Sequence, residues 1–294
     1  MSVEPVLPRY ESFDYREEAG VVQLSLNRPA KRNCLGAAFW FELPAALQRA
    51  AHSPSARCVL LEAQGPVFCA GIDLALLQEL GGLGAGADGP RRADQLRRTV
   101  LSLQAAITAL ERCPLPVLAA VQGACIGGGL DLICAADLRL AEAGTRFTPM
   151  ETDLGFVPDL GTVQRLATTL PPAVVAQWLY TCRPLGGAEA QAVGFVSQCF
   201  DDAQVLATQA LAMAREIARK PPTAVRGLKE TLRFTRAHGV TAGLDFVAAW
   251  QGGMFPGADL EQCFAARREG GAAQFAPWPT AVPFGPDRAP APES

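Results

Sequence analysis

The chain has 294 residues, of which 49% are hydrophobic and 19% are charged, and its formal net charge is −3. This composition is typical of a globular protein with a sizeable core, and we expect one large domain. Because arginine and lysine are scattered and no apolar run reaches the roughly 18 to 20 residues of a membrane span, we expect no nucleic-acid partner, no membrane and a cytoplasmic location.

Strand and helix patterns alternate in the first part of the chain. Alternating β-branched residues predict strands at 21–29 and 57–65, and helical spacing predicts a helix at 37–51 between them. A glycine-rich segment at 81–90 is expected to be mobile. It is followed by apolar residues at helical spacing, which predict a helix over 91–112.

The later elements change from mixed to helical. The apolar run at 114–123 predicts a buried strand, and the helix after it is expected to pass into a further strand near 138–141. Helices are predicted over most of 202–268. From about 270 the chain is rich in proline and alanine and lacks periodicity, so we expect this tail to be extended or partly disordered.

Cysteine and histidine usage narrows the chemistry. The nine cysteines form no CxxC pair and lie mostly in apolar stretches, which is typical of small core residues in a reducing compartment. The two histidines, His52 and His238, have sequence contexts typical of helix ends or solvated positions. This scarcity argues against a Ser-His-Asp triad and against a metal site, so acid–base work is expected to fall to carboxylates.

Two small-residue turns are candidates for binding a developing negative charge. In CIGGGLDLICAAD (125–137), three glycines precede a helix start, where free amides favour an anion. The spacing matches neither a P-loop nor GxGxxG. The segment PVFCAGIDL (66–74) offers a second such turn after a predicted strand. If the two turns converge, they form an oxyanion hole for a carbonyl oxygen.

These turns and several other segments resemble the crotonase, or enoyl-CoA hydratase/isomerase, family. The similar segments are NRPAKRNCL (27–35), GPVFCAGIDL (65–74), PLPVLAAVQGACIGGGLDL (114–132), CAADLRLAEAGTRFTPMETDLGFVPDLGTVQRL (134–166) and AEAQAVGFVSQCF (188–200). The resemblance covers about 10–268. It implies an α/β fold built as a spiral of ββα units, an acyl-CoA thioester substrate, and C-terminal helices that form a homotrimer or homohexamer.

The resemblance also implies a division of the chain and a set of binding residues. A spiral core is expected over 1–200, a helical oligomerisation region over 201–268 and a Pro/Ala-rich tail over 269–294. The oxyanion amides are implied to be those of Ile72 and Gly128. Coenzyme A belongs to the substrate, so no separate cofactor is expected. Further substrate contacts are implied for Lys31, Ala70, Gly71, Ile72 and Asp73.

Three acids are the candidate catalytic residues, and each has a structural alternative. Asp131 follows the glycines and is also suited to satisfying helix amides. Glu151, in TPMETDLGF, is otherwise expected to be a solvated loop acid. Asp159, in VPDLGTVQRL, is well placed to be the N-cap of a helix that begins near Gly161.

The combination Asp, Glu, Asp is similar to that of the Δ3,5-Δ2,4-dienoyl-CoA isomerase subgroup of the family. Such an isomerase removes a proton from C2 of a 3,5-dienoyl thioester and returns one at C6. The resemblance implies that Glu151 is the base at C2, Asp159 the acid at C6, and Asp131 a residue that orients or tunes the pair. The roles of Glu151 and Asp159 are open to exchange.

Two other functions stay open at this point. A 2-enoyl-CoA hydratase or a Δ3-Δ2-enoyl-CoA isomerase would use the same scaffold. A non-enzymatic RNA-binding or scaffold protein would also fit the family, but the near-neutral charge and the absence of a basic stripe oppose it.

Overall fold

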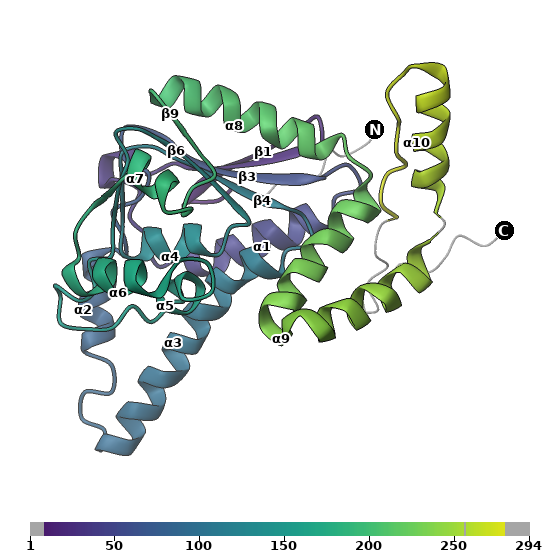
Figure 1. Ribbon diagram of the computed structural model, residues 1–294. Helices are drawn as coiled ribbons and strands as arrows, with labels where there is room; N and C mark the ends of the chain where they lie inside the picture. The colour runs from purple at the N-terminus through teal and green to yellow at the C-terminus, as the bar shows by residue number, and fades with distance from the viewer. Residues whose placement is uncertain (1–8, 256, 280–294) are drawn as a thin grey trace, which may run out of the picture.

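Six strands form the larger of two sheets in the computed structural model, which describes residues 9–255 and 257–279 (Figure 1). Across the sheet, their order is β1 (Phe13–Glu18), β2 (Val21–Leu26), β3 (Cys58–Ala63), β4 (Val117–Val121), β6 (Leu138–Glu142) and β9 (Gln198–Phe200). β1 is antiparallel to β2, and the later neighbours are parallel. The smaller sheet consists of β5 (Ala124–Ile126), β7 (Arg146–Thr148) and β8 (Leu185–Gly186).

Helices connect and cover these sheets. Before β6 they are a short 3-10 turn, η1 (Pro29–Lys31), then α1 (Phe39–His52), α2 (Leu74–Gly81), α3 (Gly89–Arg112) and α4 (Gly128–Cys134). After β7 they are α5 (Thr162–Leu166), α6 (Pro172–Thr181), α7 (Gly187–Ala192), α8 (Ala203–Ala218), α9 (Pro222–Met254) and α10 (Ala258–Glu269).

Successive turns of the chain give one strand to each sheet. β4 leads into β5, and β6 leads into β7, while the segment after β3 joins the small sheet through a bridge between Cys69 and Cys125. Gly123, at the corner between β4 and β5, has a φ of +59°, and a Cβ there would overlap the Pro66 carbonyl oxygen. The corner therefore requires glycine. The predicted α/β spiral of ββα units is confirmed.

The larger sheet buries apolar side chains on both faces. α8 covers one face, where Leu206, Ala210 and Ala214 pack against strand residues such as Leu60 and Leu118. The other face packs against the main core, to which α1, α3 and α4 contribute. Figure 1 shows α8 on one side of the sheet and α1, α3 and α4 on the other. From Val22 to Leu26 the burial of β2 alternates with the period of two expected of a strand.

The predicted strands at 21–29, 57–65 and 114–123 and the helices at 37–51 and 91–112 are confirmed, with ends shifted by a few residues. The structure adds α2, β1 and the short strands β5, β7, β8 and β9, which were not predicted. The short strands have two or three residues each, too few for a periodic pattern to form. The glycine-rich segment forms turns between α2 and α3.

The last two helices, α9 and α10, extend away from the sheets (Figure 1). α9 bends at Gly239, whose φ of 84° and ψ of 173° are not helical. Before the bend, α9 is anchored by the buried Lys229, whose Nζ lies 2.7 Å from Asp137 and donates to the carbonyls of Leu110 and Leu115. The predicted helices over 202–268 are confirmed.

The segment after α10 has no regular structure up to residue 279, as expected of an extended tail. It is nevertheless packed, because the Trp278 amide donates to the Pro54 carbonyl and the Arg226 guanidinium lies 5.4 Å from the centre of the Trp278 ring. The rest of the predicted tail, 280–294, lies outside the described residues. Within the described ranges, the helices are too short or too polar to cross a bilayer.

Candidate active site

A cavity of about 510 Å³ brings together the residues predicted from the sequence. Its lining includes the three acids, both residues with candidate oxyanion amides, and the predicted substrate contacts, namely Lys31, Ala70, Gly71, Ile72, Asp73, Gly128, Asp131, Glu151 and Asp159. These side chains and amides come from η1, from the segment after β3, from α4, and from the loop between β7 and α5. The structure therefore joins parts of the chain that lie far apart in sequence.

The two small-residue turns meet at this cavity. The segment after β3 is bonded to β5, since the Cys69 amide donates to Ala124 and the Ile126 amide donates to Cys69. A Cβ built on Gly128 would lie 3.5 Å from the Ile72 amide nitrogen, so the two candidate amides are close neighbours. Among the described residues, neither amide donates to a protein acceptor. Two free amides at one point can bind a carbonyl oxygen that gains negative charge.

The glycine before α4 makes room for one of the acids. Gly127 has a φ of +50°, and its amide donates to the Thr148 carbonyl at the end of β7. A Cβ at this position would lie 3.2 Å from Oε1 of Glu151. The missing side chain thus lets the Glu151 carboxyl group approach the start of α4, next to the Gly128 amide.

Glu151 is buried, with 6% of its surface exposed, so the alternative of a solvated loop acid is wrong. Its Oε2 has no hydrogen-bond partner among the described residues. Burial first, and then the charge of Asp131, raise the pKa of Glu151 to about 7. A buried carboxyl oxygen that lines a cavity without a partner is available to exchange a proton with a bound molecule.

Asp131 is also buried, with 2% of its surface exposed, but its carboxyl group is hydrogen bonded. Oδ1 accepts from the Thr162 amide at 2.8 Å and from the Thr162 hydroxyl at 2.6 Å. The alternative role was correct in kind, since Asp131 does satisfy a helix amide, but that amide begins α5 and not α4. Burial raises the pKa of Asp131 to about 6, and the bonds from Thr162 oppose that rise.

Asp159 is half-buried at the cavity and does not cap a helix. The N-cap of α5 is Gly161, which makes no side-chain bond, so the N-cap alternative for Asp159 is wrong. Its backbone carbonyl accepts from Gln104 Nε2 at 2.6 Å, which ties the loop to α3. Burial raises the pKa of the Asp159 carboxyl group.

The remaining predicted contacts lie at one side of the cavity. Asp73 caps α2 by accepting from the Ala75 amide at 3.1 Å, and lies 3.7 Å from the Arg28 guanidinium. Lys31 is exposed at the end of η1, next to Arg32. Sequence reasoning missed the apolar wall of the cavity, because these side chains resemble ordinary core or loop residues in sequence. They are Leu74, Leu77, Met150, Leu154, Phe156 and Leu160.

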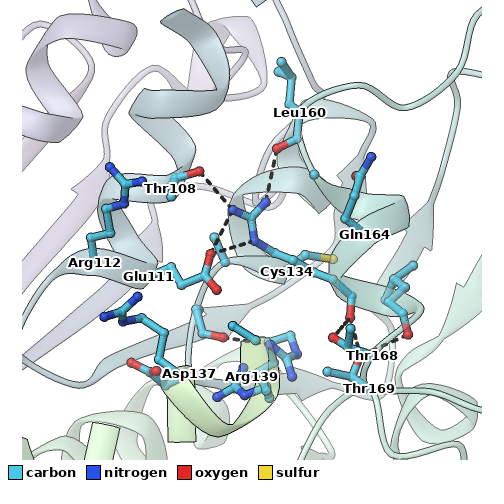
Figure 2. A pocket seen from close by; sticks show the side chains of 18 of the residues that line it. Thr108, Glu111, Arg112, Cys134, Asp137, Arg139, Leu160, Gln164, Thr168 and Thr169 are labelled. Atoms are coloured by element: carbon cyan, nitrogen blue, oxygen red, sulfur yellow. Dashed lines mark hydrogen bonds and ion pairs between the residues drawn. The ribbon is translucent and has the colours of Figure 1, made fainter. Parts of the chain in front are cut away.

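A second cavity, of about 530 Å³, shares Leu160 with the first (Figure 2). It is lined by α3, the segment after α4, α5 and α9, and it includes five arginines. None of the three acids lines it. Figure 2 shows one guanidinium, that of Arg165, which donates to the Thr108 hydroxyl, the Glu111 carboxylate and the Leu160 carbonyl. Through the Leu160 carbonyl, this network supports the loop that carries Asp159.

Several known proteins are similar to this chain in sequence and in fold. A sequence profile of the family described as "Enoyl-CoA hydratase/isomerase" matches residues 16–275. The peroxisomal Delta(3,5)-Delta(2,4)-dienoyl-CoA isomerase of Arabidopsis thaliana is 39% identical over 85% of this chain and 90% of its own length. The mitochondrial Delta(3,5)-Delta(2,4)-dienoyl-CoA isomerase of Mus musculus is 35% identical over 88% of this chain and 80% of its own length.

The same agreement is seen among solved structures. The crystal structure of an enoyl-CoA hydratase from Bacillus anthracis superimposes with a TM-score of 0.82 at 28% identity, and covers 90% of this chain and 99% of that one. Profile, sequence identity and fold agree over nearly the whole described length. The chain belongs to the enoyl-CoA hydratase/isomerase family of enzymes.

Proposed function

We propose that this enzyme converts 3,5-dienoyl-CoA thioesters into 2,4-dienoyl-CoA thioesters. The observation that carries the proposal is the presence of three carboxyl groups, Asp131, Glu151 and Asp159, in one cavity with two free amides. The relatives named dienoyl-CoA isomerases, at 35% and 39% identity, support the same choice. Family membership implies the acyl-CoA thioester as the substrate class.

The reaction moves one proton and two double bonds. Removing a proton from C2 sends its electron pair toward the thioester carbonyl, whose oxygen becomes negative in a dienolate. The amides of Ile72 and Gly128 stabilise that oxygen, and one such donor is typically worth about 3 kcal/mol in the transition state. The electrons then return along the conjugated chain, C6 takes up a proton, and the double bonds end at C2 and C4.

Glu151 is assigned as the base at C2. Its carboxyl group lies against Gly127, directly before the Gly128 amide, and C2 is bonded to the carbonyl carbon whose oxygen that amide binds. Its unpartnered Oε2 is available to accept the proton. The pKa of Glu151, about 7, is close to the value that suits a general base at neutral pH.

Asp159 is assigned as the acid at C6, and Asp131 as the residue that orients and tunes the pair. Asp159 lines the same cavity beside the apolar Leu160, and burial raises the pKa of its carboxyl group, which favours the protonated form that a donor needs. Asp131 is held by Thr162 and is therefore less free to exchange protons with a substrate.

Hydration of a 2-enoyl-CoA, or Δ3-Δ2 isomerisation, is the second candidate. The structural similarity to an enoyl-CoA hydratase favours it, because the same paired amides would serve that reaction. Hydration needs carboxyl groups that hold a water molecule near C3. Here one carboxyl oxygen of Asp131 already accepts two hydrogen bonds from Thr162, so this oxygen is less able to hold a water molecule for hydration.

Initial rates on two thioesters test the proposal. Purified enzyme is given 3,5-dienoyl-CoA and 2-enoyl-CoA of equal chain length, and the products are separated and identified. We expect the 2,4-dienoyl product to form far faster than the 3-hydroxyacyl product. If the enzyme hydrates the 2-enoyl thioester faster than it isomerises the 3,5-dienoyl thioester, the protein is a hydratase and this proposal is wrong.

A further inference from the structure

Thr162 makes two contacts to a carboxyl group on another helix. It is the first residue of α5, 1% of its surface is exposed, and both its amide and its hydroxyl donate to Oδ1 of Asp131. Oδ2 of Asp131 has no hydrogen-bond partner among the described residues. One oxygen is thus fixed by two donors while the other remains available at the cavity.

The start of α5 is itself held in place from α3. Arg165 donates to the Leu160 carbonyl at 3.2 Å and binds Glu111 of α3 at 3.1 Å (Figure 2). Gln104, also on α3, donates to the Asp159 carbonyl. The segment from Asp159 to Thr162 is therefore anchored independently of Asp131, so that Thr162 provides a fixed pair of donors.

Two donors on one carboxylate oxygen favour the ionised form of that carboxyl group. The other ionisable groups that act on Asp131 are Asp159, Arg165 and the nearby Glu151, together with the thiols of Cys125 and Cys134. A negative charge on Asp131 makes it harder for Glu151 to ionise. The bonds from Thr162 therefore influence which of the carboxyl groups in the cavity are protonated.

We propose that Thr162 is a positioning residue for the carboxyl groups of this site. Its hydroxyl holds the Asp131 carboxyl group in one orientation and keeps that group ionised. The protons that the cavity exchanges are then carried by Glu151 and Asp159. The role of Thr162 in turnover rests on the proposed isomerase function. Its effect on the carboxyl groups does not, because ionisation of the free enzyme is measured without any substrate.

The test replaces the hydroxyl with a methyl group of similar size. In Thr162→Val, the carboxyl titrations of Asp131 and Glu151 are followed by ¹³C NMR in the free enzyme. The loss of one hydrogen bond to a charged group is expected to raise the pKa of Asp131 by about one unit. The pKa of Glu151 should fall, because its neighbour is then less often charged. Thr162→Ser keeps the hydroxyl and should titrate like the parent enzyme.

Two controls separate this role from a structural one. Thr168→Val removes an exposed hydroxyl just beyond α5 that donates to the Arg165 carbonyl, and should leave both titrations unchanged. In an Asp131→Asn background, Thr162→Val should no longer shift the titration of Glu151. Together with a shift in Thr162→Val alone, this second comparison shows that the effect of Thr162 on Glu151 passes through the charge of Asp131.

The activity readout is the pH dependence of kcat/KM on 3,5-dienoyl-CoA. Since the base must be ionised, the rising limb of this profile should move to lower pH in Thr162→Val and stay in place in Thr162→Ser. Unchanged titrations in Thr162→Val, or equal shifts in the Ser and Val variants, would overturn the inference. If the titrations shift in Thr162→Val but the parent enzyme has no isomerase activity, the role of Thr162 is supported and only the proposed function is contradicted.

Discussion

Asp131, Glu151 and Asp159 line one cavity but differ in what surrounds each carboxyl group. Asp131 is hydrogen bonded through Oδ1, Glu151 is buried with one unpartnered oxygen, and Asp159 is half-buried. Burial raises the pKa of all three carboxyl groups, to about 6 for Asp131 and about 7 for Glu151. Carboxyl groups whose pKa is raised by burial in a cavity are typical of general acids and bases.

Replacing Asp159 with Asn tests the assigned proton donor. The amide cannot supply the proton for C6, so the rate on 3,5-dienoyl-CoA should fall by roughly 10²-fold or more. Substrate binding and the melting temperature should stay near those of the parent enzyme, because Asp159 makes no capping bond. Asp153→Asn, in the same loop but exposed and outside the cavity, is the matched control and should keep full activity. Full activity in Asp159→Asn would remove this residue from the mechanism.

Glu151 should make the stability of the protein depend on pH. Its pKa rises from 4.5 to about 7 on folding, so the folded state binds this proton more tightly than the unfolded state does. The resulting stabilisation is fully present below pH 4.5 and is lost as the pH rises through about 7. Glu151→Gln imitates the neutral group and should keep that stability at pH 8, where we expect it to exceed the parent by roughly 1 to 3 kcal/mol.

Denaturant unfolding at pH 4.5 and pH 8 checks this expectation. Glu261→Gln, at an exposed position on α10, is the control and should unfold like the parent at both pH values. If Glu151→Gln raises the free energy of unfolding by the same amount at both pH values, the stabilisation does not depend on the ionisation of a buried Glu151, and the expectation is wrong. The same variant should lose isomerase activity, because the C2 base is absent.

At the scale of elements, the sequence was most informative about long, periodic segments and about motifs. The strands at 21–29 and 57–65 and the long helices follow from apolar spacing alone. The convergence of the two turns was a hypothesis from their small residues, and the resemblance to the family then implied which two amides meet. The short strands of the small sheet lack a pattern of their own. They exist because β5 pairs with β7 and with the turn after β3, and because β7 pairs in turn with β8.

The partner of Asp131 is the clearest case of what sequence could not supply. Thr162 lies 31 residues further along the chain, and a threonine after glycine in a short helix carries no signal that it bonds a distant acid. The same holds for the Arg165 network behind Asp159, whose partners Thr108 and Glu111 come from α3. Such contacts depend on how the elements pack, which local pattern does not encode.

A substitution at Gly128, in the turn that starts α4, tests the position of the two candidate amides. In Gly128→Val, the new side chain would begin 3.0 Å from Cγ1 of Ile72 and 3.5 Å from its amide nitrogen, in the space meant for the carbonyl oxygen. Turnover should become undetectable while the circular dichroism spectrum keeps its parent form. Gly186→Val, at a position with open space around it, is the control and should remain active. Near-normal activity in Gly128→Val would require an oxyanion site elsewhere.

At the scale of the whole molecule, the C-terminal helices expose many apolar side chains. On α9 these include Leu228, Leu232, Val240 and Leu244, and Phe264 is exposed on α10. Exposed apolar surface of this extent is typical of a subunit interface. We therefore expect a homotrimer or a homohexamer, as the family resemblance implies.

Sedimentation velocity at micromolar concentration measures the assembly directly. We expect a single species of three or six chains, and Leu232→Asp together with Leu244→Asp should shift it toward smaller species, because each buries a charge in the interface. Phe41→Asp, at an exposed apolar position on α1, serves as the control. A well-behaved monomer in the parent protein would contradict the expected assembly. The cytoplasmic location stays a prediction, since the relatives compared above are named peroxisomal and mitochondrial.

In the proposed reaction, one proton leaves C2 and another is added at C6 of the same bound thioester. Conversion of 3,5-dienoyl-CoA in deuterated water, followed by NMR of the product, follows both transfers. We expect a 2,4-dienoyl-CoA that carries deuterium at C6, formed at a rate that falls sharply in Asp159→Asn and in Glu151→Gln. Recovery of unchanged 3,5-dienoyl-CoA, together with rapid addition of water to 2-enoyl-CoA by the same preparation, would contradict it.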